Sequence, residues 1–126
     1  MQLSWLIDAP HCRLLKWELT FLQRMIFMTY VFDIDGTICT QAFDGDYENA
    51  EPIQHRIDKV NKLYDEGNTI IFLTARGMGR SDNSQLFAIE FFTKRTREQL
   101  EKWGVKFHKL FLGKPAGDVY IDFSTL

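Results

Sequence analysis

Cysteine is scarce in this chain, which has Cys12 and Cys39 among its 126 residues. A secreted domain of this size would not depend on a single bridge, so we expect reduced thiols and a cytoplasmic protein. A strong net charge is also missing, because 15 basic and 17 acidic side chains leave a formal charge of −2. This balance argues against a surface that binds nucleic acid or an anionic membrane.

Long apolar runs are absent as well. No stretch approaches the ~18 consecutive apolar residues of a membrane span, and the chain has no repeat or low-complexity tract. What is present suffices for a core, since 45% of the residues are hydrophobic and 11 are phenylalanine. Length and composition together predict one globular domain.

The first 27 residues contain large apolar side chains and little turn chemistry. They are not a good signal peptide, because a basic start is missing and Asp8 and Pro10 interrupt the apolar stretch. Two interpretations stay open for residues 1–27: a helix that docks onto a partner, or an extension upstream of a true start at Met25 or Met28. We favour the extension, because Met28 leads directly into a predicted strand. The apolar residues at helical spacing are Leu14, Leu15, Trp17, Leu22, Met25 and Ile26.

Strand and helix patterns alternate over residues 28–126, which predicts an α/β domain with a parallel sheet. The expected strands cover 29–34, 69–74, 105–112 and 119–122. One expected helix has Pro52 in its first turn and stops at Gly67; the other covers 84–103. A capping-box pattern from Thr96 to Gln99 would let a new helix begin there and break the second one.

Polar side chains follow each predicted strand where it ends. Asp33 and Asp35 lie at the end of the first strand, Thr74 ends the second, Lys114 follows the third and Asp122 ends the fourth. Ligands of open parallel sheets bind beyond the carboxyl ends of the strands, so we expect these side chains to meet in one crevice.

This set of side chains suits phosphoryl transfer. Mg²⁺ takes oxygen ligands and is commonly held by one or two carboxylates together with phosphate oxygens. Lys114 and Thr74 would bind phosphate, and Gly36 would let backbone N–H groups approach it closely. One Asp can attack phosphorus to form an aspartyl phosphate, while the Asp two residues away handles protons.

The motif from Asp33 to Thr37 (Asp-Ile-Asp-Gly-Thr), with the downstream Thr74, Lys114 and Asp122, resembles the haloacid dehalogenase (HAD) superfamily of phosphohydrolases. The resemblance covers about residues 28–123. It implies a three-layer, Rossmann-like fold with helices on both faces of the sheet. Asp33 would be nucleophile and metal ligand, and Asp35 would be general acid/base and metal ligand through its carbonyl. Thr74 and Lys114 would bind phosphate, and Asp122 would hold Mg²⁺.

The chain departs from the family pattern near its end. Many relatives carry a second acid directly after the position of Asp122, where this chain has Phe123. Residues 117–122 also fit a Gly-Asp-x-x-x-Asp variant, which leaves Asp118 as an alternative metal ligand, although the strand pattern favours Asp122. Relatives usually continue past the position of Leu126, so a truncated carboxyl end could leave one side of the sheet uncovered and the metal weakly held.

The intervals between the motifs are too short for a large cap domain, so the resemblance implies a capless type. An open site suits a large substrate or a partner chain. Arg76 and Arg80 follow the second strand and are either substrate contacts or solvated loop charges. Phe87, Phe91 and Phe92 indicate core packing or a homodimer contact.

Two functions remain from this sequence. The first is a Mg²⁺-dependent phosphatase for a small phosphorylated metabolite, such as a sugar phosphate. The whole stretch also resembles small HAD proteins that occur in capsular-polysaccharide and sugar-phosphate gene clusters. The second is a catalytically impaired binding remnant. A signalling receiver domain is disfavoured, because the strand ending at Thr74 lacks the phosphate-accepting Asp that such a domain needs.

Overall fold

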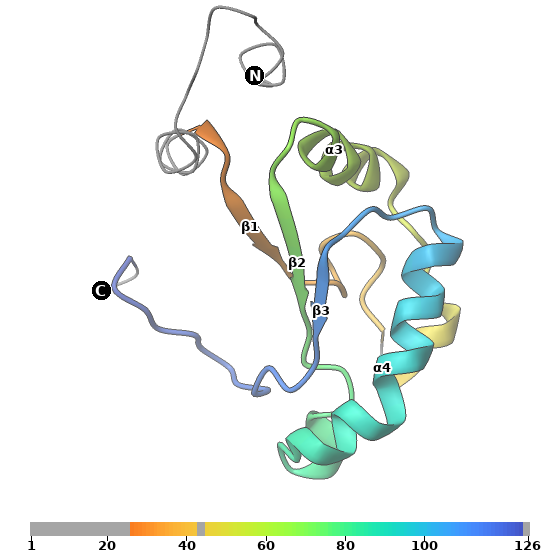
Figure 1. Ribbon diagram of the computed structural model, residues 1–126. Helices are drawn as coiled ribbons and strands as arrows, with labels where there is room; N and C mark the ends of the chain where they lie inside the picture. The colour runs from red at the N-terminus through yellow and green to blue at the C-terminus, as the bar shows by residue number, and fades with distance from the viewer. Residues whose placement is uncertain (1–25, 43–44, 125–126) are drawn as a thin grey trace, which may run out of the picture.

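The computed structural model describes residues 26–42 and 45–124. The interpretations of residues 1–25 lie outside the described residues. Figure 1 shows the resulting arrangement, in which helices pack beside a small twisted sheet. None of the described helices is long and apolar enough to cross a membrane.

Three parallel strands form the sheet, in the order β1-β2-β3 (Figure 1). Their sequences are rich in β-branched and aromatic residues, which favour a pleated, half-buried surface. The expected parallel α/β sheet is therefore confirmed for these three strands, although β3 is much shorter than the predicted range 105–112. The strands are β1 (Thr29–Phe32), β2 (Thr69–Leu73) and β3 (Lys109–Phe111).

Two α-helices connect the strands: α3 (Gln54–Asp65) and α4 (Gln85–Lys102). Pro52 precedes α3 and is not in its first turn, because Ile53 is the N-cap residue. The predicted break at Thr96 is wrong, because α4 is continuous and Thr96 is 1% exposed within it. Short 3₁₀ helices lie in the loops: η2 (Tyr47–Asn49) and η3 (Gly79–Ser81).

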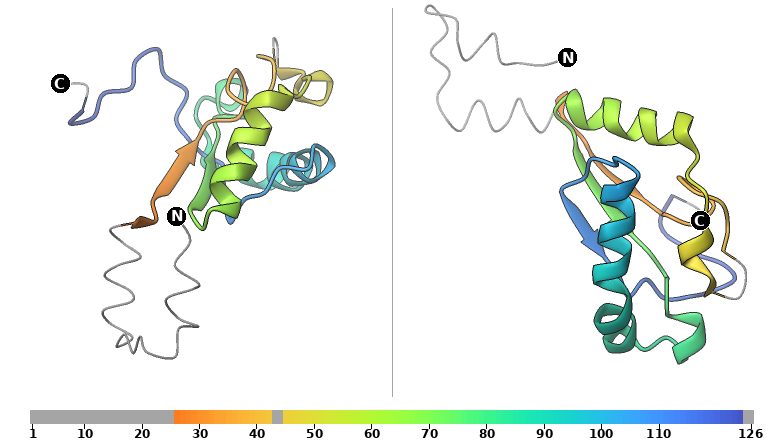
Figure 2. Two further views of the ribbon diagram at one scale, coloured as in Figure 1. Left: turned by 90° about the horizontal axis from the view of Figure 1, so that it is seen from above. Right: turned by 90° about the vertical axis from the view of Figure 1, so that its right-hand side faces the viewer.

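One face of the sheet is covered by helices, and the other face is exposed. On one face Phe32, Phe72 and Leu110 pack into a cluster with Ile57 of α3 and Leu100 of α4. On the other face the side chains of Val31 and Phe111 are 59% and 49% exposed. Figure 2, seen from above, shows α3 and α4 on the same side of β1. Over residues 26–42 and 45–124 the expected helices on both faces are therefore not found, and the described fold has one sheet layer and one helix layer.

The predicted fourth strand at 119–122 is wrong. These residues form an extended segment outside the three-stranded sheet, and in Figure 1 this segment leads away from the end of β3. One of its bonds is local, since the Tyr120 hydroxyl donates to the Pro115 carbonyl at 2.7 Å. A strand needs a hydrogen-bonded neighbour as well as a suitable sequence, and no described strand pairs with this one. Its exposed apolar side chains are Val119, Tyr120, Ile121 and Phe123.

Candidate active site

The acidic motif lies where β1 ends and the chain turns sharply. The Ile34 N–H donates to Asp33 Oδ1 at 2.8 Å, and the Ile38 N–H donates to the Ile34 carbonyl at 3.0 Å. Ile34 and Ile38 are fully buried and anchor the turn in the core. Gly36 has a φ of +79°, and a Cβ there would lie 2.7 Å from Gln41 Oε1. Its N–H donates to the Cys39 carbonyl at 2.9 Å, so that group is not free for a phosphate oxygen.

Asp33, Thr74 and Lys114 come together as the sequence predicts. Lys114 Nζ lies 3.9 Å from Asp33 Oδ2, and these side chains are 23% and 41% exposed. The Lys114 N–H donates to the Thr74 carbonyl at 3.2 Å, which fixes the loop after β3 against the end of β2. Thr74 is 1% exposed, and its Oγ1 accepts from the Arg76 N–H at 3.2 Å. A carboxylate, an ammonium and a hydroxyl therefore lie at one edge of the sheet.

Asp35 is held by Arg76 in a buried, two-pronged ion pair. Arg76 Nε and Nη2 each donate to an Asp35 oxygen at 2.9 Å, and the side chains are 2% and 13% exposed. Arg76 Nη1 also donates to Gln99 Oε1 at 2.7 Å, and the guanidinium lies 4.8 Å from the centre of the Tyr47 ring. Arg76 is thus buried, and the interpretation of it as a solvated loop charge is wrong.

Cys39 lies against the same carboxylate. Its Sγ lies 3.6 Å from both Asp35 Oδ1 and the Ile34 carbonyl oxygen, so its single S–H can donate to either acceptor. Burial and the Asp35 charge both disfavour a thiolate and raise the pKa of Cys39 from 9.0 to about 11. The thiol is therefore protonated at neutral pH and acts as a hydrogen-bond donor rather than a nucleophile.

Arg80 takes a different position from Arg76. It is exposed, its Nη2 donates to the Gly45 carbonyl at 3.1 Å, and its guanidinium lies 5.1 Å from the centre of the Phe92 ring. No carboxylate among the described residues lies within ion-pair distance of it. Arg80 therefore keeps donors that a ligand could use.

A cavity of about 430 Å³ adjoins Arg76, between the loop that contains η2 and the outer part of α4. Tyr47 and Gln99 form part of its wall, and the Gln99 amide nitrogen donates to the Tyr47 carbonyl at 2.8 Å. Neither residue was predicted as part of the site. Tyr47 lies in a loop without a motif, and Gln99 belongs to the capping-box pattern, so neither carried a local signal for this role.

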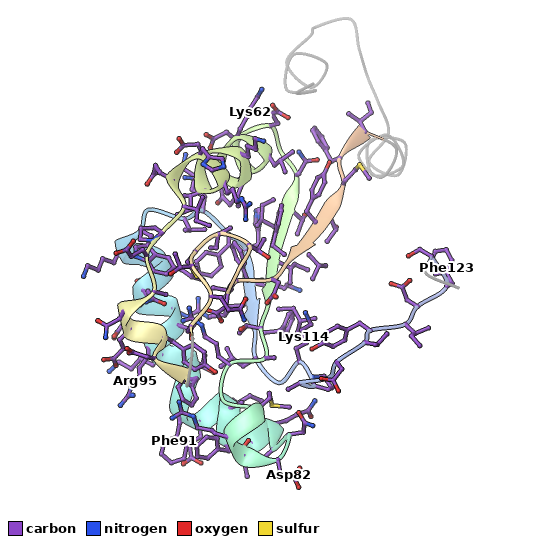
Figure 3. All side chains as sticks on the ribbon, turned by 180° about the vertical axis from the view of Figure 1, so that it is seen from behind. Lys62, Asp82, Phe91, Arg95, Lys114 and Phe123 are labelled. Carbon is purple, nitrogen blue, oxygen red and sulfur yellow. The ribbon has the colours of Figure 1, made fainter. Side chains whose placement is uncertain are left out.

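Asp122 and Asp118 are not brought to the motif. Asp122 Oδ1 accepts from the Ser124 N–H at 2.9 Å and from its Oγ at 2.6 Å, within the exposed segment that follows β3. Figure 3 shows this segment extending from Lys114 to Phe123, which lies well away from the sheet. Across residues 26–42 and 45–124, no three His, Cys, Asp or Glu side chains gather as a metal site.

A Mg²⁺ ion would therefore find part of the expected ligand set. Asp33 is half-exposed at the edge of the sheet, and the carbonyl of Asp35 lies two residues along the same turn. Mg²⁺ is often held by one or two carboxylates, water and substrate phosphate oxygens. Asp33 fits that pattern, whereas the third expected ligand, Asp122, is not in place.

The comparisons with known proteins inform the fold. A scan against protein-family models and a search of curated proteins gave no match. The structure is similar to the crystal structure of a structural-genomics target from Vibrio cholerae, with a TM-score of 0.69 and 25% sequence identity. The similarity covers 76% of this chain and 80% of that chain. It supports the α/β fold and carries no information about activity.

Proposed function

We propose that this protein is a Mg²⁺-dependent phosphatase that hydrolyses a small phosphorylated metabolite through an aspartyl phosphate. The observation that carries the proposal is the meeting of Asp33, Thr74 and Lys114 at one edge of the sheet. Asp33 Oδ2 attacks phosphorus, the bond to the ester oxygen breaks, and the substrate alcohol leaves. Water then attacks phosphorus, releases phosphate and restores the Asp33 carboxylate.

Lys114 and Thr74 stabilise the phosphoryl group in this proposal. An ammonium near the attacked phosphate offsets the charge that develops on its oxygens, and positioning and charge neutralisation supply most of the catalysis in phosphoryl transfer. The Thr74 hydroxyl accepts from the Arg76 N–H, so its own proton is available to a phosphate oxygen. Mg²⁺ held at Asp33 would supply further charge neutralisation.

Asp35 would transfer the protons. A carboxylate has about four lone-pair sites. Arg76 occupies two of them and the Cys39 thiol can occupy one, which leaves one site that would carry the proton given to the leaving oxygen and then accept a proton from the attacking water. Arg76 would orient the Asp35 carboxylate so that this site stays in a defined direction.

The HAD-like, three-layer form of the fold is part of the same proposal. In that form the exposed face of the sheet, with Val31 and Phe111, would be covered by a further layer. A capless site suits the short loops that connect the motifs.

A catalytically impaired binding remnant is the second candidate. The observation that favours it is the position of Asp122 in the extended segment, outside the group formed by Asp33, Thr74 and Lys114. Such a protein would bind a phosphate ester at Lys114 and Thr74 without turning it over.

Phosphate release from a panel of sugar phosphates, nucleotides and an aryl phosphate, with Mg²⁺ or with EDTA, distinguishes the two candidates. A phosphatase should lose at least about a thousandfold of its activity in Asp33→Asn, because the nucleophile is gone. Asp58→Asn is the matched control, since Asp58 is an exposed residue of α3 away from the site. Turnover that persists in Asp33→Asn would disprove the mechanism, and a folded but silent wild type would support the remnant.

A further inference from the structure

The cavity beside Arg76 has the size of a ligand site. Its volume, about 430 Å³, lies within the range of roughly 300–1,000 Å³ that is usual for small-molecule pockets. Its wall combines the η2 loop, the loop after β2 and one side of α4. Asp33, Thr74 and Lys114 do not line it, so the cavity is separate from the group proposed to handle phosphate.

Polar side chains dominate the wall. Ten of its twelve residues carry a polar or charged side chain, and Phe92 supplies the apolar contact. Three of the charged groups, Arg80, Glu98 and Lys102, lie outside ion-pair distance of any opposite charge among the described residues. The cavity therefore offers free donors and a free acceptor side by side.

The charges around the cavity cancel. The wall has four cationic and three anionic side chains, and the cation Arg76 is already neutralised by Asp35. Arg95 pairs with Glu48 at 3.8 Å on the rim. A balanced wall gives no net attraction for a multiply charged anion, whereas a neutral group with several hydroxyls can donate to carboxylates and accept from cations at once.

A buried hydroxyl in the wall is left without a partner. Thr96 Oγ1 is the buried side-chain polar atom in the described part of the chain that has no hydrogen-bond partner. Buried polar groups are nearly always satisfied, and an ordered water or a ligand oxygen would complete the bonding of this hydroxyl. Thr96 lines the cavity.

We propose that this cavity binds a neutral, polyhydroxylated organic group, with Arg80, Glu98 and Lys102 as its hydrogen-bonding partners. The group has two sources: a free polyol, or the alcohol part of a phosphate ester. The second source rests on the proposed phosphatase function, and Arg76 would then join the two halves of the site, because it contacts both Asp35 and the cavity.

Amide NMR spectra of the full chain, titrated with a panel of neutral hexoses, the matching hexose phosphates and inorganic phosphate, test the proposal. We expect saturable shifts at residues 45–48 and 92–102. Glu98→Gln should weaken binding roughly tenfold, because a hydrogen bond to a charged acceptor is replaced by one to a neutral acceptor. Glu90→Gln should leave it unchanged, since Glu90 is exposed on α4 and does not line the cavity.

The different probes in the titration distinguish a free polyol from the alcohol part of a phosphate ester. Shifts at the cavity with neutral hexoses indicate a free polyol. Shifts with hexose phosphates alone, at both the cavity and Lys114, indicate the alcohol part of an ester. Equal cavity shifts with inorganic phosphate, an unweakened Glu98→Gln, or a folded protein whose cavity residues respond to no probe would overturn the proposal. Because the readout is binding, a failure of catalysis alone would leave it standing.

Discussion

The segments that follow β1 (residues 33–39) and β3 (residues 116–124) each contain or adjoin a short apolar run next to a carboxylate, but they differ in how they pack. Val31-Phe32-Asp33 and Tyr120-Ile121-Asp122 are both short apolar runs that end in a carboxylate. The first run ends β1, which pairs with β2 over four residues, and its acidic turn is anchored by fully buried Ile34. The second lies outside the sheet with Ile121 66% exposed. Tertiary neighbours therefore decide which of two similar segments forms a strand.

The two segments also differ in how far along the chain their hydrogen-bond partners lie. The segment 33–39 reaches across the fold, since Asp35 bonds to Arg76, 41 residues away. The bonds within residues 116–124 join near neighbours, such as Ser124 to Asp122. An exception lies at the start of this segment, where the Ala116 N–H donates to Asn83 Oδ1 at 2.8 Å. Substitutions in the first segment should therefore cost far more stability than those in the second.

Arg76→Met should have the largest effect on stability. It leaves the partly buried Asp35 carboxylate without its cation, and breaking a buried pair from one side costs about 3–5 kcal/mol. Tyr120→Phe, which removes the bonds of the hydroxyl in the extended segment, should stay within about 0.5 kcal/mol. Urea unfolding followed by circular dichroism measures both. Arg95→Met controls for loss of an exposed ion pair, and equal losses in Arg76→Met and Arg95→Met would contradict the buried pair.

Ile34→Ala and Ile121→Ala compare one residue type in the two segments. Ile34 is 0% exposed, and its truncation should lower the free energy of unfolding by about 2–5 kcal/mol, because it loses buried area and leaves a void. Ile121→Ala should change it by less than about 0.5 kcal/mol. Thermal or urea unfolding gives the values. A large loss in Ile121→Ala would show that residues 119–122 are packed in solution.

Cys39 should be slow to alkylate in the folded protein, because few of its thiols are ionised. With its pKa near 11, on the order of one thiol in a thousand is ionised at pH 8. In a Cys12→Ser background, labelling by iodoacetamide should be slow in buffer and fast in urea. Rapid labelling of the folded protein would contradict the buried position.

The same raised pKa has a consequence for stability against pH. The folded state keeps the Cys39 proton to higher pH than the unfolded state, so the stabilisation is complete below the unfolded value of 9.0 and is lost as pH rises towards 11. Cys39→Ala should lack this part of the alkaline loss, and the difference between the two unfolding curves against pH isolates it.

Much of the fold followed from local pattern. The apolar runs that became β1 and β2, and the helices over 54–65 and 85–102, were expected within a few residues. The approach of Lys114 to Asp33 also followed, because parallel strands present their carboxyl ends at one edge. Two of the errors were at 119–122, where a strand-like pattern has no paired neighbour, and at Thr96, where a cap-like pattern lies inside a continuous helix.

The candidate site was predictable only in part. Asp33, Asp35, Thr74 and Lys114 were identified because their residue types stand at strand ends, which is a property of neighbouring residues. The pairing of Asp35 with Arg76, and the roles of Gln99 and Tyr47 around it, join segments far apart in the chain. No local signal distinguishes a buried arginine from a solvated one, because burial depends on what packs over it.

The chain's own pattern of apolar runs and turn residues was enough to specify parallel strands, two helices and a sharp acidic turn at Gly36. Whether a carboxylate at a strand end joins the site depended on packing: Asp33 and Asp35 are held near Lys114 and Arg76, whereas Asp122 lies on a segment without a paired strand. The reason is that hydrophobic periodicity acts between near neighbours. Strand pairing and ion-pair burial require partners that the fold brings from elsewhere in the chain.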